Sequence, residues 1–116
     1  MTDKLTLREK QSRFALRVAD LIQHAHALGY AVTFGEAYRS PEEAARLAKL
    51  GKGIATSLHT QRLAIDLNLF RDGVYLSSTE SHRPLGEWWE AQDPLCRWGG
   101  RFNDGNHYAM THQGRA

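Results

Sequence analysis

Three residues of this 116-residue chain could together bind a metal ion. His59 and Asp66 are seven positions apart in the segment SLHTQRLAID, and His107 follows in the segment NDGNHYAM. Two imidazoles and one carboxylate are typical ligands of a catalytic zinc ion, since three protein ligands on a tetrahedral ion leave the fourth position for water. Asp104, three residues before His107, is an acidic side chain that could transfer protons nearby. The leading hypothesis is therefore a hydrolase with one zinc ion per chain.

The composition limits the kind of molecule that could hold this site. We expect one domain over residues 1–116, which is long enough for a single hydrophobic core. Hydrophobic residues make up 41% and charged residues 24%, as in a globular protein rather than a disordered chain. The formal net charge of +2 gives no reason to expect a nucleic-acid partner. Cys96 is the only cysteine, so no internal disulfide can form, and we interpret its thiol as a small buried hydrophobic group.

The N-terminal segment MTDKLTLREKQSRF alternates charged and apolar residues. It lacks the continuous apolar run of a signal peptide. No segment of the chain reaches the roughly 20 apolar residues that are needed to cross a bilayer. We therefore expect a protein that is made in the cytosol, without a signal peptide and without membrane insertion.

The hydrophobic pattern predicts the elements that precede the site. From about residue 7 to residue 28, apolar residues recur at steps of three and four, which predicts an amphipathic helix. Residues 30–34 alternate as in a half-buried strand. A serine followed by proline then predicts a second helix over residues 41–51. Arg39 would lie at the junction of this strand and this helix, which is a rigid place from which to present a cation.

Asp66 belongs to the most regular strand pattern of the sequence. Residues 63–69 alternate aliphatic side chains with others, so Asp66 points away from the aliphatic face. A carboxylate in the middle of an apolar strand is costly to bury unless it is paired or binds a cation. The turn signal at residues 71–73 predicts a hairpin over residues 63–76.

The last third of the chain is predicted to contain one helix and one strand. Residues 84–92 are expected to be helical, with Trp88 and Trp89 in the core rather than stacked on a sugar. The glycine- and asparagine-rich segment that follows is expected to be irregular. Residues 107–110 then form a short strand that presents His107 on one face.

The remaining histidines are weaker candidates. His24 and His26 are two positions apart on the first predicted helix, so they point in different directions and cannot share a metal ion. His82 could be a second proton shuttle, but a surface position before the third helix is favoured. His112 lies in the C-terminal segment THQGRA, which we expect to be frayed.

Three segments resemble, in the same order, the LAS group of zinc peptidases, which is named for lysostaphin, D-alanyl-D-alanine peptidases and the hedgehog signalling domain. The segment SLHTQRLAIDLNLF resembles the S-x-H-x(6)-D signature of the group. The segment WGGRFNDGNHYAM resembles its W-G-G segment, which has an acid three residues before the last histidine, and YRSPEEAARL resembles the segment that carries its arginine. The matches span about residues 30–110, and the chain resembles in particular the L-alanyl-D-glutamate endopeptidases of phage endolysins. In one departure, Arg62 stands where the group often has glycine, so this loop is expected to pack differently.

The resemblance implies a role for each matched residue. It makes His59, Asp66 and His107 the zinc ligands and Asp104 the catalytic acid and base. Arg39 would bind substrate and stabilise the transition state. The fold that the resemblance implies is α+β, with a small antiparallel sheet flanked by helices, in agreement with the predicted elements.

The resemblance also implies a substrate, the stem peptide of bacterial peptidoglycan, cut between L-alanine and D-glutamate. Ser57, beside the first ligand, would support that ligand or contact the substrate. We expect a monomer that accumulates in the cytoplasm of a host bacterium and reaches the wall once a holin permeabilises the inner membrane. Two alternatives within the same fold are a D-Ala-D-Ala carboxypeptidase and a dipeptidase. Alternatives of another class are a non-catalytic zinc-containing binding module and a domain whose histidines are incidental.

Overall fold

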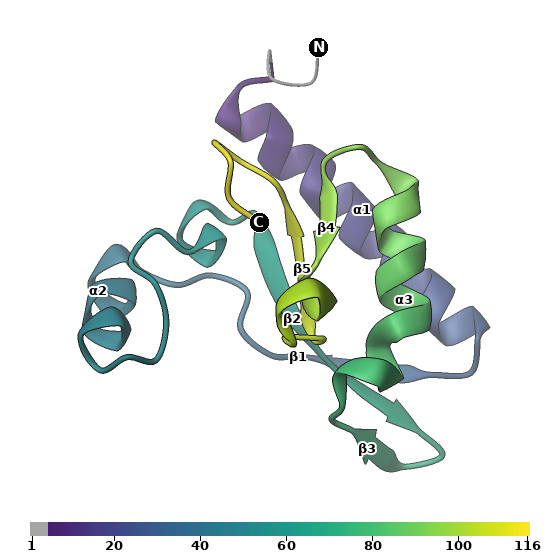
Figure 1. Ribbon diagram of the computed structural model, residues 1–116. Coiled ribbons are helices and arrows are strands. Elements are labelled where there is room, and N and C mark those ends of the chain that lie inside the picture. The colour runs from purple at the N-terminus through teal and green to yellow at the C-terminus, as the bar shows by residue number, and fades with distance from the viewer. Residues whose placement is uncertain (1–4) are drawn as a thin grey trace.

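The computed structural model of the protein describes residues 5–116; the first four residues of the N-terminal segment lie outside this range. Within it, helices and strands follow one another as Figure 1 shows. The α-helices are α1 (Leu7–Ala27), α2 (Pro41–Lys49) and α3 (Thr79–Gln92). The strands are β1 (Ala31–Phe34), β2 (Ala64–Arg71), β3 (Val74–Leu76), β4 (Cys96–Trp98) and β5 (His107–Met110), and the short 3₁₀ helices are η2 (Leu58–Gln61) and η3 (Gly99–Phe102). This is an α+β fold, as the sequence predicts.

The strands form one antiparallel sheet in the order β1-β2-β5-β4. β3 also pairs with β2, and the two are joined at Asp72 and Gly73, which confirms the predicted hairpin. Aliphatic residues of β2 alternate with partly exposed ones, so Leu67 and Leu69 are buried while Asp66 is only partly buried. The two faces of β2 therefore differ as the alternating pattern predicts.

The core lies on the aliphatic face of the sheet, under α1 and α3 (Figure 1). Phe14 of α1 packs edge-on against Trp89 of α3, with ring centroids 5.8 Å apart. Trp88 is partly buried and stacks on His24, so both tryptophans belong to the core region as predicted. Cys96 is buried as well, and burial raises the pKa of its thiol to about 12, so it acts as a small hydrophobic group. None of the helices in residues 5–116 is both long and apolar enough to span a bilayer.

α2 is capped as predicted. The Oγ atom of Ser40 accepts a hydrogen bond from the main-chain nitrogen of Glu43, and Pro41 is the first helical residue. α2 lies away from α1 and α3, and in Figure 1 the long loop after it leads back to η2. This arrangement places Arg39, directly before the cap, between the sheet and α2.

The prediction of a surface position for His82 is wrong. α3 begins at Thr79 with Ser78 as its cap, so it starts before the predicted residue 84, and Pro84 lies inside the helix. His82 is consequently on the inner side of α3 and only 2% exposed. Its Nδ1 atom lies 2.8 Å from the hydroxyl of Tyr108 on β5.

Two other predictions are wrong in part. The segment after α3 is not irregular throughout, because β4 pairs with β5 and η3 follows it. Phe34 is 65% exposed although Val32 is half-buried, since β1 is an edge strand and Phe34 is its last residue.

The C-terminal segment is ordered rather than frayed. His112 and Arg115 form an antiparallel bridge, and the Nζ atom of Lys10 on α1 lies 3.0 Å from the Nδ1 atom of His112. The guanidinium of Arg115 also donates a hydrogen bond to the main-chain oxygen of Thr56. These contacts hold the end of the chain against α1 and the loop before η2.

Candidate metal centre

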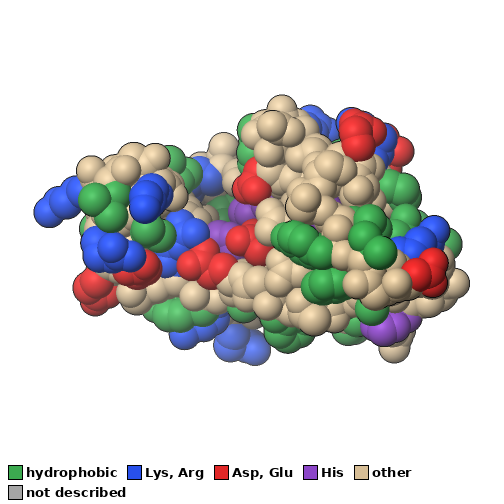
Figure 2. All heavy atoms as spheres, turned by 90° about the horizontal axis from the view of Figure 1, so that it is seen from below, with side chains coloured by type: hydrophobic (Ala, Val, Ile, Leu, Met, Phe, Trp, Pro, Cys, Tyr) green, Lys and Arg blue, Asp and Glu red, His purple; other side chains and the backbone are tan. Residues whose placement is uncertain are grey.

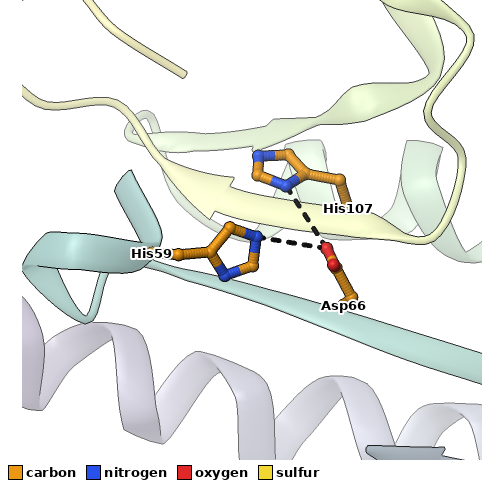
Figure 3. A group of neighbouring side chains, drawn as sticks. All are labelled: His59, Asp66 and His107. Carbon is orange, nitrogen blue, oxygen red and sulfur yellow. Dashed lines mark ion pairs between the residues drawn. The ribbon is translucent and has the colours of Figure 1, made fainter. Parts of the chain in front are cut away.

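Three elements bring the candidate ligands together. His59 comes from η2, Asp66 from β2 and His107 from the start of β5. Asp66 and His107 are direct partners across the two antiparallel strands, so their side chains share one face of the sheet. Figure 3 shows the two imidazoles pointing at the carboxylate of Asp66. The Oδ1 atom of Asp66 lies 3.3 Å from Nε2 of His59 and 3.4 Å from Nδ1 of His107.

The geometry of the three side chains fits a zinc ion. One nitrogen or oxygen from each residue lies within 4.8 Å of the others, so His59, Asp66 and His107 can hold a metal ion. For a tetrahedral ion with bonds of about 2.0–2.2 Å, neighbouring ligand atoms are about 3.4 Å apart, which matches the two measured separations. The Oδ1 atom of Asp66 is buried and has no hydrogen-bond partner in residues 5–116. A cation would satisfy this otherwise costly oxygen.

The structure also indicates which imidazole nitrogens face the ion. The Nδ1 atom of His59 lies 3.2 Å from the main-chain oxygen of Ala37, which fixes the proton on Nδ1 and leaves the lone pair of Nε2 toward Asp66. His107 faces Asp66 with Nδ1. Its Nε2 atom is buried without a hydrogen bond from the described residues. The two histidines would therefore bind a metal through different nitrogens.

The charges of the three groups are coupled. Burial raises the pKa of Asp66, but the facing imidazoles of His107 and His59 lower it more, to about 2. Burial lowers the pKa of His59, but Asp66 raises it more, with smaller contributions from Ala37 and Glu36, so it lies above 6.5. Asp66 is thus ionised at neutral pH and ready to bind a cation.

Ser57 supports the first ligand through the backbone. It caps η2, where its Oγ atom accepts a hydrogen bond from the main-chain nitrogen of His59 at 3.2 Å. At the other end of η2, Arg62 has a left-handed backbone with a φ of 56°. This conformation favours glycine, and the guanidinium of Arg62 stacks 4.0 Å from the ring centroid of Tyr38, a contact that helps to offset the strain. Arg62 therefore adopts the left-handed turn conformation at the end of η2 that a glycine would adopt without strain.

The ligands lie in a cleft of about 240 Å³. Its walls include Arg39 and Lys52 from the α2 side, and Phe102 and Asp104 from the segment before β5. Figure 2 shows histidine side chains in a hollow, with basic and acidic side chains on its rims. Asp104 is exposed, and its main-chain oxygen accepts a hydrogen bond from the nitrogen of His107 at 3.1 Å. A short turn therefore ties the acid to the third ligand.

Known proteins share this fold. No family model matches the sequence, and no curated protein does. Among solved structures, the chain is similar to the L-Ala D-Glu endopeptidase ChiX of Serratia marcescens, with a TM-score of 0.62 and 20% identity over 81% of this chain and 77% of that one. It is also similar to the vancomycin-resistance D,D-pentapeptidase VanY, crystallised as a variant in complex with Zn(II). That match has a TM-score of 0.57 and 21% identity over 86% of this chain and 71% of that one. The chain has the fold of the VanY-like zinc peptidases.

Within this VanY-like fold, the structure places around one cleft all the residues to which the sequence resemblance gives a role. Besides the three ligand candidates, Arg39, Ser57 and Asp104 line it. His82 and His112 do not belong to it. A larger cavity of about 430 Å³ lies between α1 and residues 37–38, but it contains no candidate ligand and its lining is mostly apolar. The candidate site is therefore the smaller cleft.

The VanY-like fold also brings in residues that the sequence analysis missed. Glu36 binds the guanidinium of Arg39, and that hydrogen bond is the largest of the influences that raise the pKa of Arg39. Lys52 lines the cleft from a loop and Phe102 from the end of the short helix η3, and no periodic pattern marks either residue. The carbonyl of Ala37 orients His59 through the backbone, which leaves no signal in the side-chain sequence.

Proposed function

We propose that this protein is a zinc-dependent peptidoglycan peptidase that cleaves the bond between L-alanine and D-glutamate in the stem peptide. The observation that carries the proposal is the buried Oδ1 atom of Asp66, which two imidazole nitrogens face at 3.3 and 3.4 Å on the floor of an open cleft. A closed structural site would need a fourth protein ligand, whereas three ligands leave a position for catalysis.

The fold supports the choice of substrate. ChiX is an L-Ala D-Glu endopeptidase and VanY is a D,D-pentapeptidase, so each acts on a peptide that contains D-amino acids. The sequence motifs resemble L-alanyl-D-glutamate endopeptidases in particular. We therefore assign the L-Ala–D-Glu bond as the preferred site of cleavage.

Each cleft residue has a role in this proposal. When bound by His59, Asp66 and His107, zinc supplies a Lewis acid that lowers the pKa of a coordinated water and polarises a carbonyl. Asp104 accepts a proton as water attacks the scissile carbonyl and returns it to the departing amine. Its exposed position on the cleft wall leaves room for a substrate beside it.

The cations of the cleft serve the substrate. Arg39 stabilises the charge that develops on the carbonyl oxygen or holds a carboxylate of the peptide, because its forked donors suit either anion. Lys52 forms no ion pair with the residues that the structure describes, so its charge is available to an acidic group of the stem peptide. An acidic peptide that carries D-glutamate is consistent with this wall of the cleft.

A second candidate is a D-Ala-D-Ala carboxypeptidase or dipeptidase. It is favoured by the likeness to VanY, which covers 86% of this chain. The same ligands, acid and arginine would serve that reaction, which removes residues from the free end of the stem peptide.

The proposed function includes a biological setting. We place the protein in phage-induced lysis of a host bacterium, where it acts on the wall as a monomer after the inner membrane is permeabilised. Its resemblance to endolysins supports this setting.

Incubation with purified muropeptides, with and without a chelator, tests the function. Mass analysis should show a free peptide that begins with D-glutamate and a muramic acid that retains L-alanine, and the chelator should abolish both. Loss of one terminal D-alanine would instead establish the carboxypeptidase.

A further inference from the structure

Glu36 lies beside the metal centre but is not one of its ligand candidates. The main-chain oxygen of Glu36 accepts a hydrogen bond from the nitrogen of Asp66, and the nitrogen of Gly35 donates one to the oxygen of Asp66, both at 2.8 Å. A Cβ atom on Gly35 would lie 3.1 Å from the Cβ atom of Asp66, so glycine allows this close approach. The backbone of Glu36 is therefore held by the same strand that carries a metal ligand.

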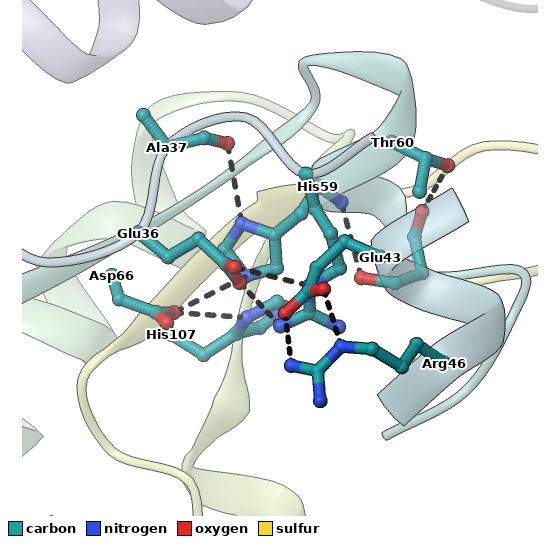
Figure 4. Close-up of polar contacts among 10 residues, drawn as sticks. Glu36, Ala37, Glu43, Arg46, His59, Thr60, Asp66 and His107 are labelled. Atoms are coloured by element: carbon teal, nitrogen blue, oxygen red, sulfur yellow. Dashed lines mark hydrogen bonds and ion pairs between the residues drawn. The ribbon is translucent and has the colours of Figure 1, made fainter. Parts of the chain in front are cut away.

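The carboxylate of Glu36 binds Arg39 with both oxygens. The Nε atom of Arg39 donates to Oε2 at 3.1 Å, and Nη2 donates to Oε1. The Oε1 atom also lies 3.9 Å from Nε2 of His59, and Figure 4 shows the carboxylate directed toward the histidine. Glu36 is not one of the three residues that could hold the metal ion, and its carboxylate contacts the centre through the side chain of His59.

Arg39 is held at further points. Its main-chain nitrogen donates to the oxygen of His59 at 3.2 Å, and its side chain is only 14% exposed. The Nη1 atom would lie 3.2 Å from a Cβ atom on Gly53, so the guanidinium packs closely against this glycine of the cleft wall. Glu36 occupies the Nε proton and one proton of Nη2, so three N–H donors, two on Nη1 and one on Nη2, remain to meet a substrate.

We propose that Glu36 is the positioning residue of Arg39: it fixes the guanidinium beside the metal centre so that its remaining N–H groups are held in place for the reacting group. This inference rests on the proposed function. A free arginine side chain samples many rotamers, and holding it in one orientation before the substrate binds lowers the cost of ordering it in the transition state. Glu36 itself touches no reacting atom.

The variant Glu36→Gln tests this role, because glutamine keeps the shape but loses the charge and one acceptor. The value of kcat/KM on a muropeptide should fall about tenfold, mostly through kcat, as expected for losing a hydrogen bond to a charged group. The melting temperature and the zinc affinity should stay within error and within twofold, respectively. The matched control is Glu80→Gln, which breaks an exposed pair with Arg83 of the same spacing on α3 and should leave kcat/KM unchanged.

A double-mutant cycle separates this role from others. In an Arg39→Ala background, Glu36→Gln should have no additional effect on kcat/KM. A tenfold loss in that background would show that Glu36 acts without Arg39 and would overturn the proposal. A weaker zinc affinity in Glu36→Gln would make Glu36 part of the metal site, and a higher activity would make it an inhibitor of Arg39; either result would also overturn it.

One readout does not depend on peptidase activity. The Nε–Hε resonance of Arg39 in an NMR spectrum should exchange slowly with water in the wild type and at least tenfold faster in Glu36→Gln. Unchanged exchange would refute the positioning contact itself. If wild-type protein cleaves no muropeptide while this difference is observed, the proposed function fails and the contact between Glu36 and Arg39 stands.

Discussion

Asp66 and His107 are direct partners on adjacent antiparallel strands, and the Oδ1 atom of the aspartate lies 3.4 Å from the Nδ1 atom of the histidine. The two residues are far apart in the sequence, so the register between β2 and β5 creates this half of the candidate metal centre. A slip of one residue would turn Asp66 into the core and remove it from the site. The pairing of Asp66 with His107 in the candidate metal centre therefore depends on the strand register of the sheet.

Asp66→Ala should remove the metal while leaving the fold. We expect the dissociation constant for zinc to rise by about a hundredfold or more, since the only anionic ligand is lost. The metal content after dialysis against a weak chelator measures this change. Asn68→Ala, on the same face of β2 but outside the cleft, is the control and should retain one zinc per chain. Equal zinc content in both variants would refute the ligand assignment.

Zinc binding should weaken as the pH falls. The pKa of His59 lies above 6.5 in the metal-free protein, so the imidazole binds a proton more readily than a free histidine does. Zinc needs the neutral imidazole, so proton and metal compete, and the apparent dissociation constant should rise roughly tenfold per pH unit below that pKa. Competition titrations at pH 8 and pH 5.5 test this. A constant affinity over the range would contradict it.

His82 should make the fold sensitive to acid. Burial lowers its pKa to about 4 from the usual 6.5, so the unfolded chain binds a proton in this window and the native chain does not. The free energy of unfolding is therefore unaffected by the titration of this group above pH 6.5. It decreases as the pH falls from 6.5 toward 4, by up to about 3 kcal/mol. Denaturant unfolding of His82→Gln should show a smaller loss over this window than the wild type. His26→Gln, an exposed change on α1, should behave like the wild type.

Gly86 is required for the packing of α3 on the sheet. A Cβ atom at this position would overlap the indole ring of Trp98, which is itself buried on β4. Gly86→Ala should therefore lower the free energy of unfolding by about 2–3 kcal/mol, although alanine favours helices. Glu87→Ala, on the exposed side of the same helix, should change it by less than about 1 kcal/mol. Equal unfolding curves for Gly86→Ala and the wild type would contradict this packing.

The alternating pattern around Asp66 was sufficient to predict its strand, its face and its hairpin, because period-two burial is a local property of the chain. Arg39 and Ser57 were also placed by local signals, a helix cap and a short motif. The three candidate ligands could be singled out because their residue types restrict the chemistry, whereas the distances between them depend on strand register.

The errors of the sequence analysis come from contacts between distant segments. His82 is buried because α3 packs against Tyr108, and the C-terminal segment is ordered because Lys10 contacts His112. The third helix was predicted to begin at residue 84, but Pro84 lies within the first turns of a longer helix that begins at Thr79. Glu36 gave no signal, since its pairing with Arg39 depends on how the chain turns away from the sheet.

The most direct test of the account is to measure bound zinc and muropeptide cleavage in the same samples of wild-type protein and Asp104→Asn. Asparagine keeps the size of the side chain but cannot accept and return a proton, so cleavage should fall by at least about a hundredfold. Zinc should remain at one equivalent per chain in both proteins, because Asp104 is not among the three ligands. Full cleavage by Asp104→Asn, or wild-type protein that binds one zinc ion and cleaves no muropeptide, would contradict the account and leave a zinc-containing binding module.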